Sequence, residues 1–289
     1  MHPVAIALVA AAAVSHAVWN LHVKRASDGG AVLIWLSTVT SVVIYAPLTL
    51  VVVLLYPPEW SWTMALVSFG TSVLHVGYFL LLQRGYQQGD MSVVYPLARG
   101  TGPILSVTFA IILFGERPNI VGIIGGAAVV AGILIIGVSR PSGASKLSAG
   151  VGYGLATGVI IATYTVYDAW AVGPLAIMPL LYDWGNNVCR SVLLAPHALR
   201  RRDQIARVWR VHRTPVMTIA VLAPASYIFV LFAYGYAPVS LVAPARELSI
   251  VVGGVLAWLL LHERQALKRI FGAVVVLAGV VALTTGTTK

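Results

Sequence analysis

Charged residues are scarce in this chain of 289 residues, where Asp, Glu, Lys and Arg together make up 10%. A soluble globular domain carries about 25% charged residues, so this sequence lacks the polar surface that such a domain needs. Hydrophobic residues make up 59% of the chain, and its mean hydropathy is +0.89. Because apolar runs of about 20 residues, the length of a membrane-crossing helix, recur throughout, the sequence predicts a membrane protein.

Cysteine and enzyme motifs are also nearly absent. The single cysteine, Cys189, lies inside an apolar run, which excludes a disulfide framework and a cysteine-based metal site. The segment 262–266 begins like the His-Glu motif of zinc proteases but has no histidine at its fifth position. The sequence contains no serine nucleophile elbow and no strand followed by a phosphate-binding glycine loop. We therefore expect no enzyme activity, no cofactor, no metal and no direct use of ATP.

The net charge of +10 would suit a nucleic-acid-binding protein, but the basic residues lie between the apolar runs. In a membrane protein such a pattern reports orientation, so we expect no nucleic-acid partner. The first run has no basic segment before it and no clear cleavage site, which predicts a retained helix rather than a signal peptide. Ten spans are predicted, at residues 3–23, 31–55, 63–83, 91–114, 119–138, 149–171, 175–195, 215–236, 239–261 and 267–285.

The second half of the chain repeats a motif of the first. The first copy runs from Ser92 to Arg117 and the second from Ser240 to Arg264, and their prolines, arginines and glutamates are 147 or 148 residues apart. Two like halves of five spans each enter the membrane with opposite orientations, because five is an odd number. The sequence predicts an all-α membrane protein of ten transmembrane helices, in two inverted-topology five-helix repeats at residues 1–142 and 149–289.

Basic residues are distributed unequally between the two faces. Fourteen of the 19 lysines and arginines lie in loops that follow odd-numbered spans, and two lie on the opposite face. An excess of positive charge marks the cytoplasmic side of a membrane protein. The charge count therefore predicts that both termini lie outside.

Two motifs resemble those of a known family. One is a cluster rich in proline and glycine, followed by an acidic-basic pair: Pro96, Arg99, Gly100, Gly102 and Pro103, with residues 115–118. The other is a short motif in the first span, residues 17–20 with Lys24. In these motifs the chain resembles drug/metabolite transporters of the EamA type, over both halves. The resemblance implies a central cavity and transport of small metabolites, often amino acids, with export favoured, in a bacterial cytoplasmic membrane.

The chain departs from this family in two ways. Glu247 follows Arg246 in the second half, where the first half has a glycine. The family is usually drawn with both termini in the cytoplasm, whereas the charge count here places them outside.

Charged residues inside the spans are the first candidates for a functional site, because burying a charge in a bilayer is costly. Three are positive and three are negative: Arg99, Asp168, Asp183, Arg190, Arg246 and Glu247. Their balance predicts internal pairing, and structural ion pairs that only hold helices together are an equal alternative. Asp183 and Arg190 share the seventh span with two asparagines, and helix packing explains them adequately.

Asp168 aligns with Asn20 at the repeat offset, and Tyr164 aligns with His16. The members of each pair are four residues apart and so share one helix face. We expect both pairs to face one cavity, where Asp168 recognises a substrate amine or carries a proton. Because Asp168 lies near the end of its span, solvation at the membrane interface is an equal alternative.

Arg99 and Arg246 follow prolines about a third of the way into their spans. Proline removes a helix hydrogen bond, and the break serves as a hinge or exposes a carbonyl ligand. Arg99 suits a substrate carboxylate, and we expect Arg99→Ala to abolish transport without unfolding the protein. Glu247 either takes part in coupling or neutralises Arg246. The predicted hinge residues are Pro96, Gly100, Gly102, Pro103 and Pro244.

Aromatic stripes at helical spacing run along the third and eighth spans, where packing is the simpler explanation and cavity lining the alternative. The predicted substrate-binding residues are His16, Trp19, Asn20, His75, Tyr78, Tyr95, Arg99, Tyr164, Asp168, Tyr227, Arg246 and Glu247. Glu116-Arg117 and Glu263-Arg264 are predicted to terminate helices.

We expect a secondary transporter that binds a small molecule near the membrane midplane and works by alternating access, with a coupled proton as one option. Membrane lipids are the other expected partners, and the oligomeric state is either a monomer or a homodimer. Two alternatives remain open. One is a flippase or transporter for a lipid-linked or quaternary-ammonium substrate, and the other is a membrane protein without transport activity.

Overall fold

The computed structural model describes residues 1–59, 61–137, 144–261 and 267–285. In these residues the chain is helical with no strand, as predicted. The helices are α1 (Pro3–Arg25), α2 (Gly30–Leu55), α3 (Trp62–Gln88), α4 (Met91–Phe114), α5 (Ile120–Gly137), α6 (Ala144–Val172), α7 (Pro179–Leu199), α8 (Arg202–Ala233), α9 (Val239–Ala245), α10 (Leu248–Leu261) and α11 (Leu267–Thr285). A 3₁₀ turn, Ser27–Gly29, joins α1 to α2.

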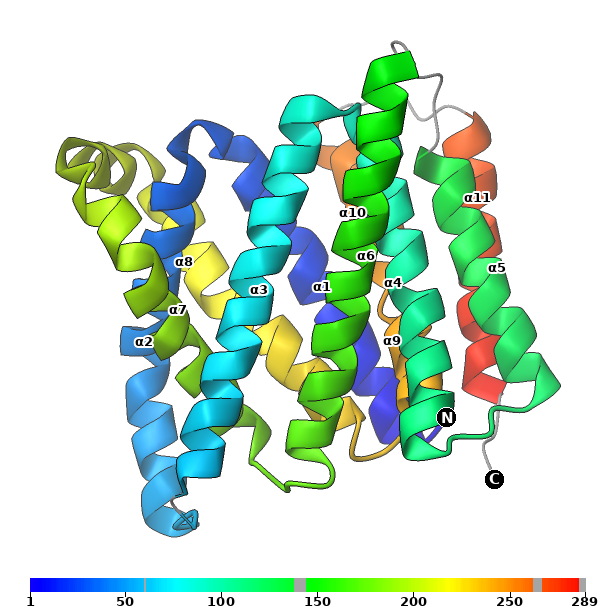
Figure 1. Cartoon of the computed structure of the whole chain (residues 1–289), viewed down its shortest axis with the longest axis horizontal. Coiled ribbons are helices and arrows are strands. Elements are labelled where there is room, and N and C mark those ends of the chain that lie inside the picture. The colour runs from blue at the N-terminus through cyan, green and yellow to red at the C-terminus, as the bar shows by residue number, and fades with distance from the viewer. Residues whose placement is uncertain (60, 138–143, 262–266, 286–289) are drawn as a thin grey trace.

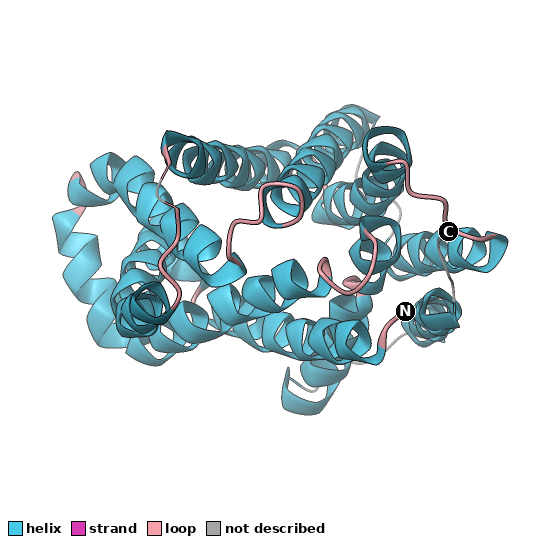
Figure 2. Ribbon diagram, turned by 90° about the horizontal axis from the view of Figure 1, so that it is seen from below, coloured by secondary structure: helices cyan, strands magenta, loops and turns pink. Residues whose placement is uncertain are grey.

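Nine helical segments of the described residues are long and apolar enough to cross a membrane, when α9 and the start of α10 are taken together. The more polar α7 runs alongside them and supplies the tenth crossing (Figure 1). Successive crossings alternate in direction, so the start of α1 and the end of α11 lie on one face and the arginine-rich start of α8 lies on the other (Figure 1). Seen from the side of the termini, the bundle has an elongated outline (Figure 2).

The packing of the helices follows a two-fold rule. Helix α1 packs on α8 as α6 packs on α3, and α4 packs on α6 as α10 packs on α1. The pairs α2–α7 and α5–α11 join each helix to its own counterpart across the axis. This arrangement confirms the predicted fold of ten transmembrane helices in two inverted repeats.

Helices α5 and α11 approach most closely at glycines. A Cβ atom on Gly125 would lie 2.8 Å from the carbonyl oxygen of Gly279, and one on Gly132 would lie 2.7 Å from that of Gly272. Gly125 is the counterpart of Gly272, and Gly132 is the counterpart of Gly279. The duplicated glycines therefore build the same backbone contact twice, on either side of the two-fold axis.

The repeats differ where the prolines occur. The ninth span was predicted as one helix from 239 to 261, but the helix is interrupted at Arg246-Glu247, between α9 and α10. Here the chain tightens to i→i−3 hydrogen bonds, as from Glu247 N to the carbonyl of Pro244 (3.0 Å). In the first repeat, α4 continues through Pro96 and Pro103 without interruption. The predicted proline break is thus present only in the second repeat.

The residues between the predicted spans 175–195 and 215–236 were not assigned to a helix, but α8 already begins at Arg202. It bends at His212, whose φ and ψ are −119° and 26°. At the bend, His212 Nε2 lies 2.9 Å from the carboxylate of Asp28. The hydrogen bond from His212 lowers the pKa of Asp28 below its ordinary value. The second copy of the closing motif, Glu263-Arg264, lies outside the described residues.

Candidate substrate-binding site

The interface between the repeats contains a buried ion pair. Nη2 of Arg99, on α4, lies 2.7 Å from Oε2 of Glu247, in the break between α9 and α10. Their side chains are 7% and 0% exposed. The pair is close but poorly aligned, because neither Glu247 oxygen has a hydrogen-bond donor in good geometry among the described residues. Glu247 therefore neutralises an arginine of the other repeat rather than the adjacent Arg246.

Arg246 is buried as well, with 8% of its surface exposed. It forms no ion pair or hydrogen bond with any residue that the structure describes. Its guanidinium nitrogens nevertheless remain accessible to water. Its electrostatic neighbours are Tyr164, Tyr234, Glu247 and Tyr227. An arginine with open donors inside a membrane protein is a binding group for an anion.

Aromatic side chains from three helices surround this arginine. The ring of His75, on α3, stacks on Tyr164 of α6 at 4.4 Å and meets Tyr227 of α8 edge-on at 5.3 Å. Tyr78 meets Tyr164 edge-on at 6.0 Å. The Nδ1 atom of His75 lies 2.9 Å from the carbonyl oxygen of Thr71, one turn earlier on the same helix. The two predicted aromatic stripes therefore meet at one place.

Asp168 is completely buried on α6. It accepts a hydrogen bond from the hydroxyl of Tyr182 on α7 at 2.5 Å and another from the hydroxyl of Tyr227. This rules out the alternative in which Asp168 is solvated at the membrane interface. The sequence analysis did not single out Tyr182, because neither a repeated motif nor an aromatic stripe marks it, although it directly precedes Asp183.

Asn20, the counterpart of Asp168, has a different environment. It is exposed, and its side chain donates to the carbonyl of His16 on its own helix at 2.8 Å. Both residues are near the ends of their helices, and inverted repeats place these ends at opposite faces of the membrane. Asn20 therefore does not share the environment of Asp168, and the expectation that both pairs face one cavity stays a prediction.

The remaining predicted residues lie closer to the two arginines. His16 packs edge-on against Trp19 at 4.8 Å, and it lies within electrostatic range of Arg99 and Arg246. Tyr95 lies within range of Arg99 and Glu247. Ten of the twelve predicted substrate-binding residues thus belong to, contact or neighbour the buried charges of Arg99, Arg246, Glu247 and Asp168, which we call the charged centre. Trp19 packs against the cluster of Val32 and Leu33, and Asn20 is exposed.

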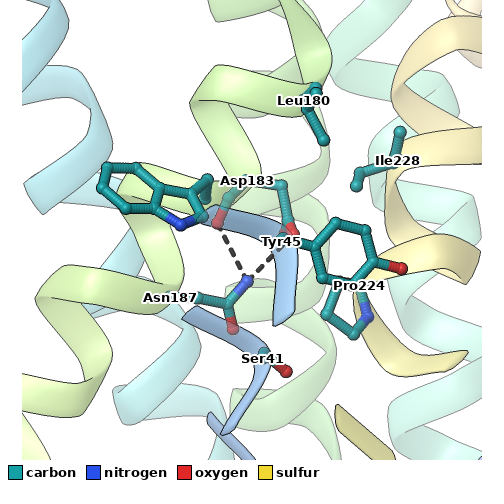
Figure 3. Close-up of a pocket in the computed structure, with 8 residues that line it drawn as sticks. Ser41, Tyr45, Leu180, Asp183, Asn187, Pro224 and Ile228 are labelled. Carbon is teal, nitrogen blue, oxygen red and sulfur yellow. Dashed lines mark hydrogen bonds between the residues drawn. The ribbon is translucent and has the colours of Figure 1, made fainter. Parts of the chain in front are cut away.

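A second polar cluster joins α7 to α2 and α8 (Figure 3). Asn187 donates to both the carbonyl and the carboxylate of Asp183 at 2.9 Å, and Tyr45 donates to the carbonyl of Val221 at 2.7 Å. The space between these side chains has no room for a water molecule. Their contacts support the packing role predicted for the seventh span.

Glu116 was predicted only to terminate α4, but its carboxylate reaches the other repeat. It accepts hydrogen bonds from the backbone N–H groups of Val239 at 2.8 Å and Ser240 at 2.9 Å, in the first turn of α9. Gly115, at φ 67°, ends α4 in the left-handed conformation that allows this turn. The duplication of the Glu-Arg pair was the signal for this contact.

A cavity of about 190 Å³ lies between α4, α5 and α9. Pro103 and Pro244 are among its walls, and the half-exposed Ile104 and Ile123 open it toward the lipid-facing surface. The buried hydroxyl of Ser240, which also lines it, has no partner among the described residues. This crevice is separate from the charged centre.

Two inverted repeats that cross a membrane and meet at buried charges define a membrane transporter by architecture. The chain belongs to the EamA-like transporter family, whose model matches residues 3–138 and, a second time, residues 148–285. This family transports small solutes across membranes and is not enzymatic. One crystal structure of a protein has the same fold, with a TM-score of 0.74 and 18% sequence identity over 97% of this chain and 96% of that chain. No curated protein matches the sequence.

Proposed function

We propose that this protein carries an amino acid or a related small carboxylate across a bacterial cytoplasmic membrane by alternating access, with Arg246 as the carboxylate-binding residue. The observation that carries this proposal is the open guanidinium of Arg246 at the repeat interface. A carboxylate there would gain charge-assisted, bidentate hydrogen bonds that no residue of the described chain supplies. Arg99, the carboxylate ligand expected from the sequence, is instead paired with Glu247.

The aromatic residues are suited to the rest of such a substrate. His75, Tyr164 and Tyr227 present ring surfaces beside Arg246. The hydroxyls of Tyr78, Tyr164 and Tyr234 have no hydrogen-bond partner in the described residues and are not sealed from solvent. Rings with free hydroxyls bind an apolar side chain while offering polar contacts to its backbone atoms.

Alternating access requires the two repeats to move against each other. The break after Pro244 gives α9 and α10 a hinge beside Arg246, and α4 offers Pro96, Gly100, Gly102 and Pro103 as the counterpart. Export is the direction favoured by the resemblance to the family, and a coupled proton is part of the proposal.

The second candidate is a flippase for a lipid-linked or quaternary-ammonium substrate. It is favoured by the crevice between α4, α5 and α9, which opens to the lipid-facing side and contains the unpartnered Ser240 hydroxyl. An apolar chain in this crevice would remain in contact with the membrane. A carboxylate substrate would not need this crevice, so the substrate panel below separates the two functions.

The test is uptake of labelled amino acids, organic acids, amines and a lipid analogue into proteoliposomes with an imposed pH gradient. We expect saturable uptake of a carboxylate, and Arg246→Ala should weaken it at least about 30-fold, because losing a buried charge pair costs 2–5 kcal/mol. Arg246→Lys should restore part of the affinity. Arg210→Ala, which removes an exposed arginine of α8, is the matched control. Wild-type transport by folded Arg246→Ala, or uptake of the amines or lipid alone, would contradict the proposal.

A further inference from the structure

The buried acids of this protein differ in how their charge is balanced. Glu247 has Arg99 at 2.7 Å. Asp183 accepts an amide hydrogen bond from Asn187, in a cluster without free space. Among the described residues, the hydrogen-bond partners of Asp168 are neutral hydroxyls, those of Tyr182 and Tyr227, with the hydroxyl of Thr71 next to them. Asp168 is therefore a buried acid next to the aromatic rings of His75, Tyr164 and Tyr227. When it is ionised, no cation among the described residues contacts it directly.

The described helices that pack around Asp168 bring several polar groups, but a single cation, toward its carboxylate. The polar groups that face it are Thr71 from α3, Tyr167 from its own helix, Tyr182 and Asp183 from α7, Tyr227 and Tyr234 from α8, and Arg246 at the break after α9. Helix α4 contributes apolar residues, Ala110 and Phe114, which pack by the neighbouring Ala169. Arg246 is the one cation in this set, and it is within electrostatic range but not in contact.

Asp168 and Arg246 share their neighbours. Tyr227 donates a hydrogen bond to Asp168 and is also an electrostatic neighbour of Arg246, and Tyr234 is within range of both. A zwitterion has a carboxylate and an ammonium group a few atoms apart, and both need partners when water is removed. With the carboxylate on Arg246, Asp168 is the acid left to accept the ammonium group, because Glu247 is already paired.

We propose that Asp168 binds the ammonium group of a zwitterionic amino acid and a proton in turn, which makes the protein a proton–substrate antiporter. The inference rests on the proposed function, because it needs the carboxylate on Arg246. In the empty site, a proton on a carboxylate oxygen of Asp168 removes the cost of an isolated buried charge. When the substrate enters, that O–H bond breaks, the proton leaves to water, and the ammonium group donates to the carboxylate.

The charge balance fixes the direction of coupling. The empty, protonated site carries the single positive charge of Arg246, and the occupied site is neutral, because Asp168 is ionised and the substrate has no net charge. One exchange therefore moves a zwitterion one way and one positive charge the other way. An inward proton gradient and an inside-negative potential would both drive the substrate out of the cell, as in export.

The experiment measures substrate binding to the purified, full-length protein by calorimetry across a pH series and in two buffers of different ionisation enthalpy. The probe is the proteinogenic amino acid that gives the largest thermal stabilisation, and its N-acetyl derivative is the matched ligand without an ammonium group. We expect the amino acid to release one proton on binding and its affinity to rise about tenfold per pH unit below the midpoint of the transition. The N-acetyl derivative should release none.

Two variants locate the proton. Asp168→Asn can still accept a tyrosine hydrogen bond, so it should fold and bind the amino acid more weakly, without pH dependence and without proton release. Asp183→Asn should release the proton as the wild type does. Absence of proton release from the wild type, or release that persists in Asp168→Asn or is lost only in Asp183→Asn, would overturn the inference. If Asp168→Asn does not fold, the amino acid and its N-acetyl derivative on the wild type still decide whether the ammonium group displaces a proton.

Failure of the proposed function has a different signature. In that case no amino acid stabilises the wild-type protein, or Arg246→Ala binds one as well as the wild type does. Binding that depends on Arg246 but shows no proton release would keep the carboxylate site and refute the antiport role of Asp168.

Discussion

Arg99 and Arg246 hold the same position in the two repeats, but only Arg99 has an ion-pair partner. Arg99 lies on the continuous helix α4 and contacts Glu247, whereas Arg246 lies at the break between α9 and α10 with its donors open. The repeat therefore preserves the residue while dividing its roles. One arginine joins the halves, and the other is available to a ligand.

A single deleted residue accounts for the difference in helix geometry. Two residues separate Pro96 from Arg99, but one residue separates Pro244 from Arg246. Removing one residue from a helix rotates everything after it by about 100°, so the flanking segments cannot both keep their buried faces unless the helix is interrupted. The interruption places Glu247 against Arg99 of the other repeat.

The largest effect is expected from breaking this ion pair. Arg99→Ala leaves Glu247 buried without a cation, which costs about 3–5 kcal/mol and should lower the thermal midpoint by roughly 10 °C. This expectation replaces the one from the sequence, that Arg99→Ala would fold normally. Arg246→Ala leaves no contacting partner unpaired, and it should keep wild-type stability while losing transport. Thermal unfolding in detergent, read by size-exclusion chromatography, compares the two variants.

A double variant separates charge from packing. Replacing both Arg99 and Glu247 with methionine removes the two charges together, and it should recover most of the stability that Arg99→Ala loses. If Arg99→Ala is as stable as the wild type and Arg246→Ala is not, the two arginines have the opposite roles.

The sequence was sufficient for the fold because length, hydropathy and duplication all bear on it. Spans of apolar residues and a motif repeated in register predicted the ten helices and their inverted order. The sequence identified the residues of the charged centre but not which of them form the ion pair. Adjacent residues on a helix do not face each other, so Arg246 was a poor partner for Glu247, and the real partner lies 148 residues away on another helix. The environment of Asp168 likewise depends on Tyr182 and Tyr227, which only the packing brings to it.

An intermediate effect is expected where the repeats resemble each other most, at the glycines of α5 and α11. A methyl group on Gly132 would lie 2.7 Å from the carbonyl oxygen of Gly272, so Gly132→Ala should cost about 1–3 kcal/mol through overpacking. Its counterpart Gly279, whose Cβ would lie 2.7 Å from the oxygen of Gly125, should lose as much when replaced by alanine. Thermal unfolding of the two variants would test the symmetry directly.

Gly126→Ala is the matched control on the same helix. Its Cβ would meet nothing closer than Pro244 at 3.7 Å, an ordinary contact, so this variant should keep wild-type stability. Equal losses for Gly126→Ala and Gly132→Ala would show that helix propensity or lipid contact, rather than the close crossing, determines the effect.

The smallest effect is expected from Glu116, which ties the end of α4 to the start of the helix that carries Arg246. Glu116→Gln keeps one acceptor oxygen and loses one of the two hydrogen bonds, because it turns an amide donor toward the second backbone N–H, so it should cost about 0.5–1.5 kcal/mol, the range for one hydrogen bond. Because Glu116 touches neither Arg246 nor Asp168 through any hydrogen bond of the described residues, substrate affinity should be unchanged. Arg117→Gln removes an exposed charge next to it and should cost nothing measurable. If the two variants unfold at the same temperature, the contact from Glu116 to α9 contributes nothing measurable to joining the repeats.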